Sequence, residues 1–106
     1  MNTDNDGSSM MPLEDLTVEK LNHILNKIKL YRMASIVKTY NIENIQKLNA
    51  LEKELELFEY SLGYSIMNGL ISDDEAIKRG FNLDYISSAM HNYAVNQEQK
   101  VKTFAK

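Results

Sequence analysis

Three glutamates near the middle of the chain have the residue type and the spacing of a metal site. Glu52, Glu56 and Glu59 fall on one face of a helix, where carboxylate oxygens can bind a hard cation. The same spacing is typical of the solvated face of a helix with heptad periodicity, and no oxygen-rich loop accompanies the glutamates. We therefore interpret them as a solvent-facing surface and predict no bound metal.

The other residue types that carry out catalysis lack the partners that they would need. The two histidines, His23 and His91, belong neither to an H-E-x-x-H pair nor to the E-x-x-H pairs of di-iron helical bundles. The chain has no cysteine, which excludes thiolate chemistry and disulfides. No serine lies in a G-x-S-x-G motif, and no glycine belongs to a phosphate-binding loop. We predict that the chain is not an enzyme and that it binds no cofactor and no small-molecule substrate.

The segment SDDEAIKRGFNLDYISSAMHNY, residues 72–93, predicts two short helices joined by a turn. Ser72 and Glu75 form the S-x-x-E capping box of a helix start, Gly80 suits the left-handed position after a helix, and Asn82 can cap the next helix. Over this stretch alone, the spacing resembles a helix-turn-helix of the arabinose-activator type. The residues that carry the resemblance are Ala76, Gly80, Phe81, Tyr85, Ile86, Ser87, Met90 and Tyr93.

DNA binding by this segment is the alternative function. Arg and Lys make the commonest contacts to guanine and to phosphate, but the second helix of the segment has neither residue and carries the carboxylate Asp84. The net charge of −3 also argues against a dedicated nucleic-acid binder. We therefore predict that the helix pair serves packing, with Phe81, Ile86 and Met90 buried. In the alternative, the base-reading residues are Ser87, Ser88, His91 and Asn92.

These residues are positioned by an all-α fold. Apolar periodicity predicts a long antiparallel helical hairpin, formed by helices from about Thr17 to Tyr40 and from Asn44 to Leu70, because a short connection makes neighbouring helices antiparallel. A short helix, 73–79, and a last helix from Leu83 to the mid-nineties or beyond complete a small helical bundle. We predict a mobile N-terminal arm, 1–12, and a single domain, 13–106, whose last residues can fray.

Charge is distributed unevenly between the two long helices. The first helix is rich in lysine and arginine, whereas Leu51 to Tyr60 carries four glutamates and one lysine. Antiparallel packing places these opposite charges along the edges of the hairpin, where they attract each other. We therefore predict ion pairs within the hairpin and not a nucleic-acid surface on the first helix.

The second long helix carries two apolar stripes. The first stripe consists of Leu48, Leu51, Leu55, Phe58 and Leu62. The second stripe consists of Leu57, Tyr60, Tyr64, Met67 and Ile71. A helix buried on two sides contacts two elements of its own fold, or one element and a partner chain. We predict the second stripe as the partner-binding surface. Gly63 permits a close helix contact, and Gly69 marks the end of the helix.

The function expected by elimination is protein–protein binding. We predict a small regulatory, inhibitory or adaptor protein that acts through a helical face, as a homodimer or with another protein as partner. The N-terminal sequence MNTDNDGSSMM lacks the basic region and the apolar run of a signal peptide, and no apolar run reaches the length of a membrane span. We therefore expect a cytoplasmic location and no membrane partner.

Overall fold

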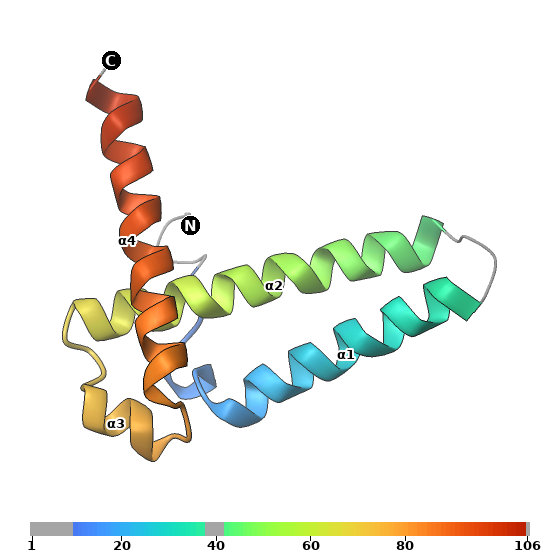
Figure 1. Cartoon of the computed structure of the whole chain (residues 1–106), viewed down its shortest axis with the longest axis horizontal. Coiled ribbons are helices and arrows are strands. Elements are labelled where there is room, and N and C mark those ends of the chain that lie inside the picture. The colour runs from blue at the N-terminus through green and yellow to red at the C-terminus, as the bar shows by residue number, and fades with distance from the viewer. Residues whose placement is uncertain (1–9, 38–41, 106) are drawn as a thin grey trace.

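The all-α fold predicted from the sequence is confirmed in a computed structural model, which describes residues 10–37 and 42–105, with side chains for 10–34 and 42–98. Within these residues, four α-helices follow one short 3-10 helix, and no strand occurs (Figure 1). The elements are η2 (Leu13–Asp15), α1 (Val18–Val37), α2 (Ile42–Met67), α3 (Asp73–Lys78) and α4 (Leu83–Ala105).

The helix ends of the hairpin follow local sequence signals. Thr17 caps α1, because its Oγ1 accepts a hydrogen bond of 3.2 Å from the backbone N–H of Lys20. α2 ends at Met67, before the predicted end at Leu70, and Gly69 follows with a φ of 77°. This left-handed conformation suits glycine, so Gly69 marks the helix end as predicted. The predicted end of the first helix at Tyr40 lies outside the described residues.

The predicted start and stop signals of the two last helices are confirmed. The Ser72 side chain accepts a hydrogen bond of 3.0 Å from the Glu75 N–H at the start of α3. Gly80 has a φ of 104°, which a side chain would strain. Asn82 Oδ1 accepts a hydrogen bond of 2.7 Å from the Tyr85 N–H and caps α4. α4 continues to Ala105, well beyond the mid-nineties.

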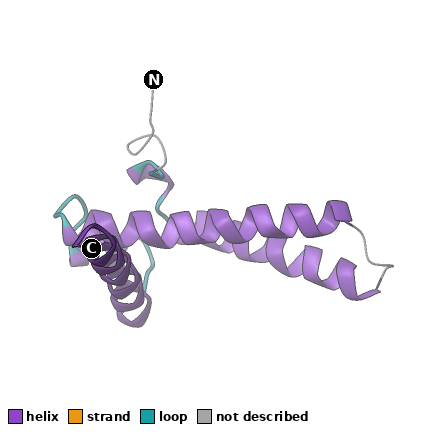
Figure 2. Cartoon of the chain, turned by 90° about the horizontal axis from the view of Figure 1, so that it is seen from above, coloured by secondary structure: helices purple, strands orange, loops and turns teal. Residues whose placement is uncertain are grey.

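The helices α1 and α2 lie antiparallel, side by side, in both views of the chain (Figures 1 and 2). Two ion pairs join them, Lys20–Glu54 at 3.3 Å and Arg32–Glu52 at 3.0 Å. The predicted attraction between the basic first helix and the acidic part of the second is therefore confirmed. Exposed pairs contribute only about 0–1 kcal/mol each, so apolar packing must supply most of the stability of the hairpin.

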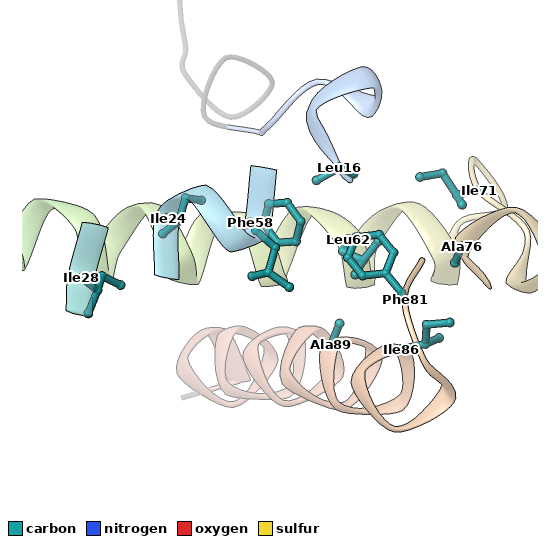
Figure 3. Packing of buried hydrophobic residues seen from close by; sticks show 11 residues of the cluster. Leu16, Ile24, Ile28, Phe58, Leu62, Ile71, Ala76, Phe81, Ile86 and Ala89 are labelled. Carbon is teal, nitrogen blue, oxygen red and sulfur yellow. The ribbon is translucent and has the colours of Figure 1, made fainter. Parts of the chain in front are cut away.

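The core lies at one end of the hairpin, where α1 begins and where the second half of α2 meets α3 and α4 (Figure 3). Phe58 and Leu62 of α2 are fully buried, and the Phe58 and Phe81 rings lie 6.0 Å apart. The predicted burial of Phe81 and Ile86 is confirmed, with exposed fractions of 3% and 2%, and Met90 is half-buried against the core. Two of the three side chains that were predicted to be buried in this segment are thus buried, and the third, Met90, is buried only in part.

Gly63 sets the contact between α2 and α4. A Cβ atom at this position would clash with the backbone carbonyl of Ala89 and would lie 2.9 Å from the Cβ of Tyr93. The predicted close helix contact at Gly63 is thus confirmed, and α4 is the helix that makes it. Tyr93 then packs on the rings of Tyr60 and Tyr64, at centroid distances of 5.2 and 5.7 Å.

The residues before α1 lie against the body of the fold. The Met11 N–H donates a hydrogen bond of 2.9 Å to the buried Ser61 Oγ on α2, and the Met11 side chain packs against the core. The predicted arm, 1–12, mostly falls outside the described residues. Its last residues are described, and they already contact the domain that the sequence analysis begins at residue 13.

Arg79 fastens this N-terminal segment to α3. Its guanidinium donates hydrogen bonds to the backbone carbonyls of Leu13 and Leu16, the second at 2.9 Å, and to Glu75 Oε2 at 3.0 Å. Leu16 itself is fully buried. A side chain near the end of α3 therefore holds the segment that covers one side of the core.

The molecule is extended for its length. Its radius of gyration is 15.8 Å, whereas a compact domain of this size has a value of about 13 Å. The far end of the hairpin and the last turns of α4 both project from the core region (Figure 1). Among the described residues, no helix has the length and apolar character needed to cross a membrane.

Candidate protein-binding site

Glu52, Glu56 and Glu59, considered above as a possible metal site, have different surroundings in the fold. Glu52 pairs with Arg32, Glu56 is exposed, and Glu59 accepts a hydrogen bond of 3.2 Å from the Tyr85 hydroxyl. Burial, followed by the charge of Glu59 and this hydrogen bond, raises the pKa of Tyr85 far above its usual range, so Tyr85 stays a neutral donor. No group of three metal-ligating side chains gathers anywhere in the described residues.

The predicted partner-binding stripe is divided between the core, α4 and solvent. Ile71 is only 2% exposed and belongs to the core. Tyr60 and Tyr64 pack on Tyr93, and the Tyr60 hydroxyl also accepts a hydrogen bond of 2.8 Å from Gln97. Leu57 is half-buried, and Met67 is 53% exposed. The second buried side of α2, which the sequence analysis reserved for a partner, therefore has an element of the same chain as its main contact.

The residues of the DNA-binding alternative all lie exposed on α4. Ser87, Ser88, His91 and Asn92 face outward. From Leu83 to Gln99 the sequence has no Lys or Arg. Arg79, just before α4, directs its guanidinium to backbone carbonyls and to Glu75. The side chains of the basic tail, 100–106, lie outside the described side chains.

The far end of the hairpin exposes large apolar side chains. Up to the middle of α1, Ile24 and Ile28 are 1% and 5% exposed. Beyond Ile28, Leu30 and Met33 are 66% and 55% exposed, and Ile42 at the start of α2 is 70% exposed. No other described element covers this end, since α4 crosses α2 near the opposite end (Figure 1). The sequence analysis did not identify this surface.

An open groove of about 490 Å³ runs between α1 and α2 at this end. Leu30, Tyr31, Ala50 and Leu51 supply its apolar lining, and a lysine of each helix completes it: Lys27 of α1 and Lys47 of α2. We call this feature the hairpin groove.

The two lysines of the hairpin groove differ in their contacts. The Lys47 ammonium lies 3.8 Å from Glu43 Oε2 and 5.8 Å from the centroid of the Tyr31 ring. Lys27 forms no ion pair with any side chain that the structure describes. The hairpin groove thus combines an apolar floor with positive charge from both helices.

No protein-family model, curated protein or solved structure matches this chain. The hairpin groove is therefore interpreted from its own geometry.

Proposed function

We propose that this chain is a small regulatory, inhibitory or adaptor protein of the cytoplasm that binds a partner protein through the hairpin groove. The observation that carries the proposal is the apolar lining of the groove, in which Leu30 is 66% exposed. Met33 and Ile42, outside the lining, are also exposed at this uncovered end of the hairpin. Neighbouring apolar side chains in contact with water, edged by polar residues, mark protein interaction sites, because their burial is favourable.

The architecture supports the same conclusion. Two antiparallel helices bury their facing stripes against each other, and bundles add further helices to cover what remains. Here α4 provides that cover at one end of α2 only (Figure 1). A helix or hairpin from another protein would complete the bundle at the far end. Helix-in-groove binding is a common mode of peptide and protein recognition.

The sequence also suggested a homodimer and, as an alternative function, a DNA-binding regulator. Each of them requires contacts that an experiment can detect. A homodimer through the second stripe would need Tyr60 and Tyr64 to contact both Tyr93 and a second chain. DNA binding through α4 would need a cationic surface beside Ser88 and Asn92, and it would weaken steeply as the salt concentration rises.

The test is differential capture from an extract of the native host. The wild-type chain, Leu30→Glu and Leu83→Glu serve as baits, and bound proteins are quantified by mass spectrometry. Leu83 is a matched control, because it is 63% exposed at the start of α4 and Leu30 is 66% exposed. We expect a partner that is retained by the wild type and by Leu83→Glu and lost with Leu30→Glu. Equal retention by all three baits, or equal loss with both variants, would contradict the proposal.

A further inference from the structure

The chemistry of the hairpin groove also indicates what kind of partner it accepts. We infer that the occupant is an acidic amphipathic helix of a different protein, with an apolar stripe flanked on both sides by carboxylates. This inference rests on the proposed function and specifies the partner class of the same site.

The apolar stripe of the occupant follows from the floor of the groove. Leu30 and Tyr31 come from α1, Ala50 and Leu51 come from α2, and the axes of the two helices run side by side (Figure 2). A helix laid between them presents side chains at i, i+3, i+4 and i+7 to such a floor. Ala50 is small, which lets the backbone of the occupant approach α2 closely.

The acidic flanks follow from the lysines, one on each side of the groove. Lys27 has no ion-pair partner within the described residues, and Lys47 has only the exposed contact with Glu43 at 3.8 Å. The Lys47 ammonium lies 5.8 Å from the centroid of the Tyr31 ring, which attracts the cation toward the floor of the groove. Carboxylates on both flanks of an apolar stripe therefore meet a cation on α1 and a cation on α2.

A second copy of this chain fits the groove less well. A two-fold interface places the same surface on both sides, so the lysines of one copy would face those of the other. In the acidic stretch of α2, Glu52 already pairs with Arg32 and Glu54 already pairs with Lys20, so these two carboxylates do little to offset the repulsion. Like charges opposite each other disfavour association and thereby select against the wrong partner.

The experiment measures binding of synthetic helical peptides to the full chain by fluorescence anisotropy. The peptides have about 18 residues, enough for a marginally stable helix, and share one leucine stripe. One peptide carries glutamates beside the stripe, a second carries lysines there, and a third carries glutamates but alanines in place of the leucines. Each is titrated at low and at physiological salt, because attraction between exposed charges is screened by ions.

We expect the glutamate-flanked peptide to bind roughly tenfold more tightly than the lysine-flanked one, and the alanine peptide not to bind measurably. The double variant Lys27→Glu/Lys47→Glu should reverse this preference. The control Lys29→Glu/Lys53→Glu changes the net charge equally, at exposed lysines of α1 and α2 that do not line the groove, and should preserve it. Leu30→Glu should abolish binding of the glutamate-flanked peptide.

Three results would overturn the inference. The first is a glutamate-flanked peptide that binds no more tightly than the lysine-flanked one. The second is a control double variant, Lys29→Glu/Lys53→Glu, that also prefers the lysine-flanked peptide. The third is a dimer in sedimentation equilibrium that Leu30→Glu dissociates, because a second copy then occupies the groove. If the lysine-flanked peptide binds and Leu30→Glu abolishes that binding, the acidic partner is wrong while the proposed function stands. If no peptide binds and Leu30→Glu leaves host capture unchanged, both fail.

Discussion

The two ends of the α1–α2 hairpin both carry large apolar side chains, but they bury them to different degrees. At the near end, Ile24, Phe58 and Leu62 are at most 1% exposed because α4 and the N-terminal segment pack around them. At the far end, Leu30 and Ile42 are 66% and 70% exposed. The comparison teaches that burial in this chain depends on where α4 crosses α2, and that crossing is set at Gly63.

The largest expected difference between the two ends is in the stability lost when a large side chain is truncated to alanine. We expect Phe58→Ala to lower the free energy of unfolding by about 3–5 kcal/mol, because it leaves a cavity in a packed core. Leu30→Ala should change it by less than about 0.5 kcal/mol, since Leu30 is mostly exposed. Urea unfolding followed by circular dichroism measures both. Comparable losses in the two variants would mean that the far end is packed like the near end.

The crossing at Gly63 gives a prediction whose sign is diagnostic. In an ordinary helix interior, Gly→Ala stabilises by about 1 kcal/mol. At this position the added methyl group would clash with the Ala89 carbonyl, so we expect Gly63→Ala to destabilise by about 1–3 kcal/mol. The same unfolding experiment decides between the two signs. If Gly63→Ala stabilises the protein, α4 lies farther from α2 than described. The crossing at Gly63 would then not explain why the two ends of the hairpin differ in burial.

Much of the near end could be predicted from the sequence, because its signals are local. The caps at Thr17, Ser72 and Asn82 and the stop at Gly80 depend on residues within one turn of each other. The close contact at Gly63 was also predictable, since a glycine inside an amphipathic helix usually has a packing reason.

The partner of each helix face was not predictable in the same way. The stripe that contains Tyr60 and Tyr64 has the same pattern whether α4 or a second chain lies against it, and the choice depends on the direction that α4 takes after Gly80. The far end was missed for a related reason. Leu30 and Met33 widen the apolar face of α1, and periodicity alone does not reveal that they stay exposed at the far end. At the groove, α2 offers Leu30 the small Ala50, the charged Lys47 and Leu51.

A smaller contrast separates the half-buried Arg79 from the exposed Arg32. We expect Arg79→Ala to destabilise by about 1–3 kcal/mol, because it leaves the Leu13 and Leu16 carbonyls without this donor. Arg32→Ala removes only an exposed ion pair with Glu52 and should cost about 1 kcal/mol or less. Thermal unfolding of both variants makes the comparison. An equal decrease in the melting temperature of the two variants would show that Arg79 does not hold the N-terminal segment in place.

The smallest predicted effect depends on pH and concerns the near end only. The pKa of Tyr85 is raised in the folded chain, so its contribution is full below the ordinary tyrosine pKa of about 10 and is lost as the pH rises above it. As the pH rises, the Tyr85 hydroxyl loses its proton in the unfolded chain before it does so in the folded chain. The free energy of unfolding therefore decreases as the pH rises further. One ionising group limits the slope to about 1.4 kcal/mol per pH unit, and the partial burial of Tyr85 narrows the pH range over which this slope applies.

Tyr85→Phe removes this ionisation, so its stability should decline less than that of the wild type between neutral pH and about pH 11. Urea unfolding of both proteins across that range provides the measurement. Parallel decline of the two proteins would show that the other titrating groups account for all of the alkaline loss.

Native-state hydrogen exchange, read by NMR or mass spectrometry on the full chain, tests the contrast between the two ends most directly. Amides open locally with free energies that follow the packing around them. We predict strong protection for 56–66 and 85–93, where α2 and α4 pack together, and weaker protection for 26–34 and 44–52 at the far end of the hairpin. Equal protection along the whole of α2 would contradict the account, because the far end would then be as well packed as the core.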